Sequence, residues 1–194
     1  MKVVKMNIEF SVLGKEIETP RVILRPFEET DLKDFNEYAS VPGVGELAGW
    51  PHHKNLEESK EKLSIILDKK DTFAIFHKKD KKVIGSFSLR SSWSSRNKVY
   101  EHLKAKEIGY VLAKPYWGQG IVPEIVEYVK DFAKNELGIQ ALGVAYMGEN
   151  NQSRRVIEKA GFTYIETGKF YLKHLEKELD DHRYIFIFNT IKMS

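Results

Sequence analysis

Two glycines, two residues apart, stand directly before an apolar run with helical periodicity. The loop reads Pro115-Tyr116-Trp117-Gly118-Gln119-Gly120, and the run extends from Ile121 to Ala133. Ahead of the loop, Glu107 to Leu112 has the composition of a strand. Glycine lets the backbone approach an anion closely, and the N–H groups in the first turn of a helix have no intrahelical acceptor. The strand, loop and helix together therefore predict a phosphate-binding site.

A second motif lies further along the chain, where Asn150-Asn151-Gln152-Ser153 leads into a short helical run that ends before Gly161. With the glycine loop and the opening segment Thr19-Pro20-Arg21-Val22-Ile23-Leu24-Arg25, it resembles the GNAT superfamily of acyl-CoA N-acyltransferases. More narrowly, it is similar to the branch that contains the RimJ and RimL ribosomal-protein N-terminal acetyltransferases. The resemblance runs from about Thr19 to about Asn189, with the motifs in the family's order.

This resemblance implies a reaction and its two substrates. The acyl donor would be acetyl-CoA, and the acceptor a primary amine, either a protein N-terminus or a small amine such as an amino acid, a polyamine or an antibiotic. The amine would attack directly in a ternary complex, because a chain without cysteine has no thiol to carry the acyl group. The alternative is a non-catalytic acyl-CoA-binding sensor. A dinucleotide-binding domain is poorly supported, because the loop lacks the third glycine of G-x-G-x-x-G.

The resemblance also implies how the chain holds the donor. The pyrophosphate would lie on the N–H groups around the two glycines, and Asn150 would bind the pantetheine arm. Pro123 departs from the family pattern and removes one N–H from the first turn, so a side chain such as Lys114 could replace it. Arg154 and Arg155 either meet CoA phosphates or face solvent. The residues expected to contact the donor are Tyr110, Val111, Leu112, Trp117, Gly118, Gln119, Gly120, Ile121, Val122, Asn150 and Ser153.

Two proton transfers need catalytic groups. Glu107 stands where some GNAT members carry the general base. The alternative is that Glu107 is a solvent-exposed glutamate at the start of a strand. Glu46, Glu101 and Glu166 are the other candidates for the base. The departing thiolate needs a proton, and the tyrosine that many GNAT enzymes place seven residues after the asparagine is Ile157 here. The resemblance leaves that role to Ser153. Its alternative is that Ser153 or Asn151 only caps the following helix. A free N–H at Tyr110 or Val111 would polarise the thioester carbonyl.

The acceptor site is expected in two connections. Trp50, His52 and His53 follow the first predicted helix, where this family builds its acceptor site. Trp93 and Tyr100 lie in the polar stretch from Ser91 to Lys106, which is long for a loop. Two adjacent histidines do not share one face of a helix or strand, so no metal site is expected from them.

The composition narrows the class of protein. The 194 residues suit one domain, with residues 1–18 as a short N-terminal extension. The 31 basic and 28 acidic residues give a net charge of +3, too balanced to predict nucleic-acid binding. No apolar run is long enough to span a membrane, and the N-terminus lacks a secretory apolar segment, so the expected compartment is the cytoplasm.

The apolar patterns predict an α/β (α+β) domain, a GNAT-like mixed and mostly antiparallel sheet flanked by helices. Asn7 to Ile17 is expected to be a short extended or hairpin element, and Lys78 to Lys82 to be a hairpin turn. A homodimer is compatible with the aromatic C-terminal strands and with the family. Strands are expected at 21–25, 72–76, 83–89, 107–112, 140–146, 162–166 and 184–189, and helices at 31–39 (capped by Thr30), 55–67, 121–133 and 151–160.

Overall fold

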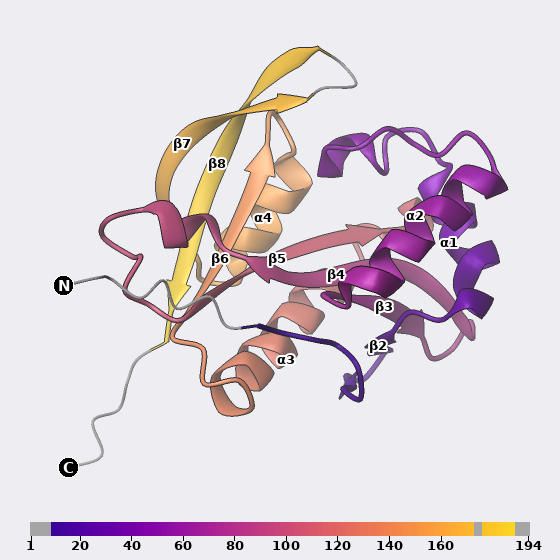
Figure 1. Cartoon of the computed structure of the whole chain (residues 1–194), viewed down its shortest axis with the longest axis horizontal. Helices are drawn as coiled ribbons and strands as arrows, with labels where there is room; N and C mark the ends of the chain where they lie inside the picture. Colours follow the sequence, from indigo (N-terminus) through magenta and orange to yellow (C-terminus); the bar gives the residue numbers. More distant parts are fainter. Residues whose placement is uncertain (1–8, 173–175, 189–194) are drawn as a thin grey trace.

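The computed structural model describes residues 9–172 and 176–188, and one eight-stranded sheet runs through them (Figure 1). Its strand order is β1-β2-β3-β4-β5-β6-β8-β7. Only β5 and β6 pair in parallel, and every other neighbouring pair is antiparallel, which confirms the mixed, mostly antiparallel sheet. The strands are β1 Ile17–Glu18, β2 Val22–Pro26, β3 Thr72–His77, β4 Lys82–Ser91, β5 Ala105–Leu112, β6 Ala141–Met147, β7 Thr163–Leu172 and β8 Lys177–Ile187.

Helices cover both faces of this sheet. α1 (Leu32–Ala39) and α2 (Leu56–Lys69) pack over one face, and α3 (Ile121–Asn135) and α4 (Asn151–Lys159) over the other (Figure 1). Four short 3-10 segments lie in the connections: η1 Glu29–Asp31, η2 Glu46–Ala48, η3 Trp93–Arg96 and η4 Lys114–Tyr116. Of these, η2, η3 and η4 border the functional site.

The largest core cluster explains why α3 forms where it does. Ile121, Ile125 and Val129 recur every four residues, so they share one face of the helix, and all three are buried against the sheet. Burial of each such side chain contributes about 1.5–3 kcal/mol. The helix begins after Gly120, whose φ of 75° lies in the left-handed region that favours glycine. This packing fixes the start of α3 against the sheet.

β5 and β6 separate halfway along their length. Their parallel pairing runs from Ala105↔Ala141 to Ile108↔Val144 and then stops. Beyond this point β5 remains paired with β4 as far as Leu112, and β6 remains paired with β8 as far as Met147. The sheet therefore opens between the second halves of its two central strands.

Several predicted boundaries were wrong. The last two strands are longer than expected, because nearly all of their added residues are exposed or half-buried and lack the alternation that predicts a strand. Thr30 is not a cap, since Glu28 and Asp31 form a reciprocal capping box around η1. The stretch from Ser91 to Lys106 contains η3 and the ends of two strands. Asn7 and Asn189, which bounded two predicted segments, lie outside the described residues.

The lysine-rich turn was predicted correctly, since residues 78–81 join β3 to β4. Asn55 is the N-cap of α2, as predicted, and its side chain accepts a hydrogen bond from the Glu58 N–H. None of the helices in the described part of the chain combines the length and the apolar character needed to cross a membrane.

Candidate active site

A cavity of about 930 Å³ lies where β5 and β6 separate. It brings together most of the predicted site residues: Trp93, Glu107, Tyr110, Val111, Leu112, Trp117, Gly118, Gly120, Ile121, Val122, Asn150 and Ser153. The predicted residues that do not line it are Trp50, His52, His53, Tyr100 and Gln119.

One end of the cavity is formed by the glycine loop. Gly118 and Gly120 have φ values of 73° and 75°, and the N–H groups from Gly118 to Val122 have no acceptor among the described residues. Pro123 has no N–H, and the next donor, Glu124, is already bonded to the Gly120 carbonyl at 3.2 Å. Five free donors at the positive end of a helix fit a pyrophosphate, which needs hydrogen-bond donors and a positive potential.

Arg21, the residue directly before β2, holds this loop. Its guanidinium donates to the carbonyl of Gln119 at 2.7 Å and pairs with Glu124 at 2.7 Å. Gln119 therefore stabilises the loop through its carbonyl group, and its side chain donates to Pro115 outside the cavity.

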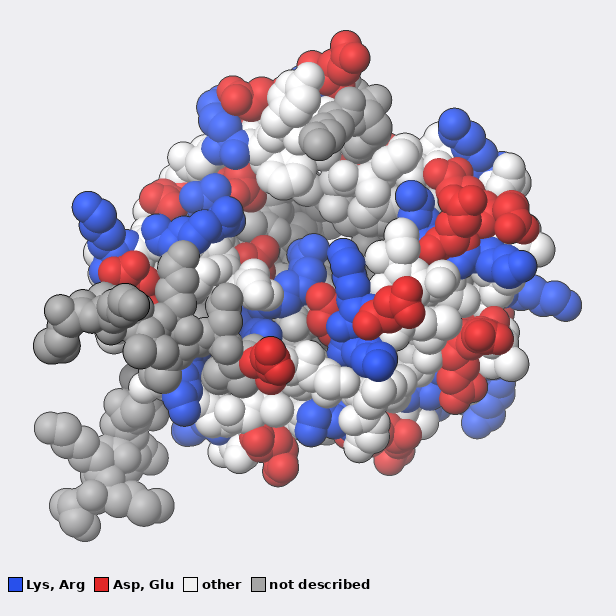
Figure 2. Space-filling view, viewed as in Figure 1, with Lys and Arg blue, Asp and Glu red and all other residues white. Residues whose placement is uncertain are grey.

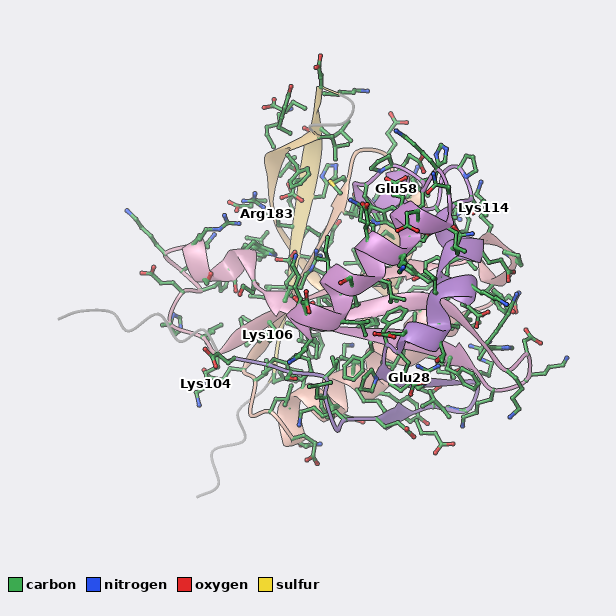
Figure 3. The ribbon with its side chains drawn as sticks, turned by 45° about the vertical axis from the view of Figure 1, so that its right-hand side comes forward. Glu28, Glu58, Lys104, Lys106, Lys114 and Arg183 are labelled. Carbon is green, nitrogen blue, oxygen red and sulfur yellow. The ribbon has the colours of Figure 1, made fainter. Side chains whose placement is uncertain are left out.

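The cations considered as phosphate ligands occupy different places. Lys114 donates to the carbonyl of Pro42, and in Figure 3 it lies beside the α1–α2 connection, well apart from Arg183 on β8. Arg154 pairs with Glu158 at 2.8 Å. Arg155 lines the cavity from α4 and is the one of these three placed to meet a bound anion.

Asn150 begins α4 and ties it to the opposite wall. Its side-chain oxygen accepts from the Ser153 N–H at 3.1 Å, so Asn150 is the cap, and not Ser153 or Asn151. Its amide nitrogen donates to the carbonyl of Leu47 in η2 at 3.1 Å. This pair of bonds fixes the start of α4 relative to the α1–α2 connection.

The Ser153 side chain has a different partner. Its Oγ lies 2.8 Å from the hydroxyl of Tyr110 on β5. Burial raises the pKa of Tyr110 to about 12, against a smaller lowering by the bond to Ser153. Both hydroxyls are therefore protonated at neutral pH, and together they can supply a proton to an anion in the cavity.

Glu107 faces the cavity from the other side of β5. Residues three apart on a strand point to opposite faces, so Glu107 and Tyr110 lie on opposite sides of the sheet. One carboxylate oxygen of Glu107 accepts from the Trp93 N–H at 2.9 Å. Burial raises the pKa of Glu107, while the Trp93 N–H and the charges of Arg90 and Arg96 oppose this rise. A raised pKa makes Glu107 a stronger base than an ordinary glutamate once it is ionised.

The rival carboxylates lie elsewhere. Glu46 accepts bonds from the Gly43 N–H at 2.7 Å and the His52 ring at 2.6 Å, and it does not line the cavity. Glu101 also lies outside it, and Glu166 pairs with Arg183 at 3.0 Å.

The backbone of β5 offers two donors at the opening. The Ala113 N–H donates to Ile84 on β4, and donors alternate along an antiparallel strand. The N–H groups of Tyr110 and Leu112 therefore point toward β6, from which β5 has separated, while that of Val111 points toward β4. Of the two, Tyr110 lies nearer the point of separation and is placed to polarise a carbonyl group in the gap.

The predicted acceptor residues divide into two groups. Trp50 and His53 pack together, with ring centroids 5.2 Å apart, and His53 is buried with its Nδ1 2.8 Å from the Ser59 hydroxyl. Trp93 does line the cavity, and Tyr100 packs edge-on against its ring at 6.3 Å. Across the described ranges, no group of three or more His, Asp or Glu side chains could hold a metal ion.

A charged group that the sequence patterns did not predict lines the cavity together with Trp93 and Glu107. It consists of Arg90 of β4, Arg96 of η3, and Asp181 and Arg183 of β8. Arg90 is the cross-strand neighbour of Glu107, so the two side chains share a face. Arg183 is the neighbour of Ala145 on β6. Strand pairing brings Arg90, Asp181 and Arg183 together, and the η3 segment that follows β4 adds Arg96. No local motif in the sequence marks these residues.

Comparison with known proteins gives consistent results. The chain is 28% identical over 179 residues to a Bacillus subtilis (strain 168) protein named "Probable N-acetyltransferase YjcK", a match that covers 87% of this chain and 94% of that protein. The GNAT-family acetyltransferase from Bacillus anthracis superposes with a TM-score of 0.76 at 19% identity, over 89% of this chain and 98% of that one. RimL, a ribosomal L7/L12 alpha-N-protein acetyltransferase solved with coenzyme A, superposes with a TM-score of 0.72 at 17% identity, over 90% and 98%.

The family model described as an acetyltransferase (GNAT) domain matches residues 21–163. That span runs from Arg21, which holds the glycine loop, through Ser153 and α4. The chain belongs to the GNAT family of acetyl-CoA-dependent acetyltransferases.

Proposed function

We propose that this protein transfers the acetyl group of acetyl-CoA to a primary amine by direct attack in a ternary complex. Glu107 acts as the general base, and Ser153, bonded to Tyr110, protonates the leaving thiolate. The observation that carries this assignment is the separation of β5 and β6, with Glu107 on one face of β5 and the Tyr110–Ser153 pair on the other. A base and an acid on opposite sides of one opening suit a reaction in which the nucleophile and the leaving group occupy different sides.

Donor binding is assigned to the glycine loop and the start of α3. The five free N–H groups from Gly118 to Val122 would receive the pyrophosphate, with Arg155 on the neighbouring helix as an added cation. Pro123 has no N–H group, so the first turn of α3 lacks one donor. Lys114 does not replace it, because its ammonium group donates to the carbonyl of Pro42. We therefore expect Arg155 to carry the compensating contact.

The proposed proton transfers balance the reaction. The amine nitrogen forms a bond to the thioester carbon and gives a proton to Glu107. The Tyr110 N–H stabilises the oxyanion of the tetrahedral intermediate. When the carbon–sulfur bond breaks, the sulfur takes a proton from the Ser153 hydroxyl, and Tyr110 can replace that proton through its 2.8 Å bond.

The test is release of free thiol from acetyl-CoA in the presence of a panel of amines. We expect amine-dependent thiol release, a loss of about 100-fold or more in Ser153→Ala, and unchanged donor affinity in that variant. Asn151→Ala is the control, because Asn151 lies on the same helix turn without a side-chain bond in the described structure. Stabilisation by acetyl-CoA without thiol release for any amine would identify a sensor and not an enzyme.

A further inference from the structure

The end of the cavity lined by Trp93 and Glu107 is called the acceptor end here, and it holds more cations than acids. Arg90, Arg96, Arg183 and Lys169 line it, against the acidic residues Glu107 and Asp181. These residues come from β4, β5, η3, β7 and β8, so strands from both sides of the opening contribute. Figure 2 shows Lys and Arg side chains gathered over the segment that carries η3, beside the base of the β7–β8 hairpin.

Two of the four cations are already neutralised. Arg183 pairs with Asp181 at 2.7 Å and with Glu166 at 3.0 Å, and Lys169 pairs with Asp180 at 2.7 Å. Arg90 and Arg96 make no ion pair with any carboxylate in the described residues. Two guanidinium groups in the cavity are thus left for a ligand.

The position of Arg90 is built into the sheet. A Cβ placed on Gly109 would lie 2.6 Å from its Nη2 atom, so any side chain at Gly109 would displace the guanidinium. Gly109 is the first β5 residue after the pairing with β6 ends. The guanidinium therefore lies over β5 at the mouth of the opening, on the same face as Glu107.

The positive charges of Arg90 and Arg96 favour some acceptor amines over others. An acceptor with further cationic groups would be repelled by Arg90 and Arg96, whereas a carboxylate would neutralise them. Guanidinium and carboxylate groups form strong, often bidentate, charge-assisted hydrogen bonds. A carboxylate held near Arg90 would also place a neighbouring amine close to Glu107.

We propose that the acceptor is an amine that also carries a carboxylate, and that Arg90 and Arg96 bind this carboxylate. This inference rests on the proposed N-acetyltransferase activity. The carboxylate can come from a free amino acid or from an acidic side chain next to a peptide N-terminus, and both present the same chemistry to the two arginines.

The test compares kcat/KM for matched acceptors at saturating acetyl-CoA. The first pair is an amino acid and its amide, and the second is an amide-capped peptide beginning Ser-Asp and one beginning Ser-Asn. Spermidine is tested beside them as a polyamine without a carboxylate. We expect the carboxylate member of at least one pair to be favoured by about 10- to 100-fold, and spermidine to be the poorest acceptor. The pair with the larger ratio identifies the source of the carboxylate.

Arg90→Gln and Arg96→Gln should raise KM for the carboxylate acceptor about 10-fold or more and leave KM for its amide unchanged. Lys98→Gln is the matched control, because it removes one exposed positive charge close to Arg96 from a residue outside the cavity. Loss of an arginine also alters the environment of Glu107, but that effect would change kcat for both members of a pair. The selective change in KM is therefore the signature of direct binding.

Equal kcat/KM within every pair, or equal effects of the variants on both members, would overturn the carboxylate proposal while leaving acetyl transfer intact. Preference for spermidine would overturn it as well. Absence of thiol release with every acceptor would overturn the proposed function and, with it, this inference.

Discussion

The hydroxyl of Tyr110 lies 2.8 Å from Oγ of Ser153, and this contact joins the central strand β5 to α4. The position where many GNAT enzymes carry a tyrosine on this helix is Ile157, which is buried in the core and has no proton to give. Tyr110 thus brings a phenol to the same region from a different element. The proposed acid is therefore a pair of hydroxyls, one from the strand and one from the helix.

This pairing predicts the behaviour of a double variant. Tyr110→Phe keeps the ring, which stacks on Phe87 at 6.3 Å, and removes only the hydroxyl. Ser153→Ala should lower kcat by about 100-fold or more, and Tyr110→Phe by less. If the two hydroxyls act in series, the double variant should be no slower than Ser153→Ala. Additive losses in kcat would show that they act independently.

The environment of Glu107 predicts a pH dependence. Burial raises its pKa, and a base must be ionised to act, so the rate is lost as pH falls through this raised pKa. The acid limb of kcat/KM should have its midpoint above the ordinary glutamate value of about 4.3. Because Arg90 lowers this pKa, Arg90→Gln should move the limb to higher pH. A limb at or below the ordinary value would show that Glu107 is not the titrating base.

Asn150 should contribute to the stability of the fold. Asn150→Ala removes the cap of α4 and the bond to Leu47, so the free energy of unfolding should fall by about 0.5–2 kcal/mol or somewhat more. Chemical denaturation measures this loss, and Asn151→Ala provides the control on the same turn. Equal stability of the two variants would contradict the capping role.

The glycine loop predicts a ligand-specific shift in stability. At 100 times its dissociation constant, acetyl-CoA should stabilise the protein by about 2.7 kcal/mol. Gly120→Asp should abolish this shift, because it adds a negative charge beside the proposed pyrophosphate site. A Cβ at Gly120 meets only Arg21 at 3.7 Å, and Asn and Asp tolerate a positive φ better than most residues. Gly120→Asn is therefore the neutral control, and it should retain more of the shift. Equal responses of the two variants would place the pyrophosphate elsewhere.

The sequence predicted those parts of the fold and site that depend on local pattern. α3 was predicted because its apolar residues recur with helical spacing, and the glycine loop because its donors are backbone groups adjacent in sequence. Trp50 and His53 look like binding residues in a loop, but Trp50 is half-buried against the core cluster that contains Phe35 and Leu63, and His53 is buried beside Phe35. Chemical type alone does not show whether an aromatic residue in a loop packs against the core or lines the cavity.

The acceptor end required the three-dimensional structure. Arg183 lies far along the chain from Arg90 and Arg96, and the pairing of β4, β5, β6 and β8 in one sheet brings it to the same cavity as these two arginines. The extended β7–β8 hairpin that carries Arg183 was predicted too short, because its outer residues are mostly exposed. The pair of Tyr110 and Ser153 likewise depends on how α4 packs beside β5.

In the proposed mechanism, Glu107 removes the proton of the attacking amine. This role is tested by kcat of Glu107→Gln at saturating acetyl-CoA, measured by thiol release between about pH 6 and pH 9. The variant keeps the shape of the side chain but cannot accept a proton, so kcat should fall by about 100-fold or more near neutral pH. It should recover in part at higher pH, where free amine is more abundant, with unchanged affinity for acetyl-CoA. A near-normal rate across this pH range would contradict the assignment of Glu107 as the base.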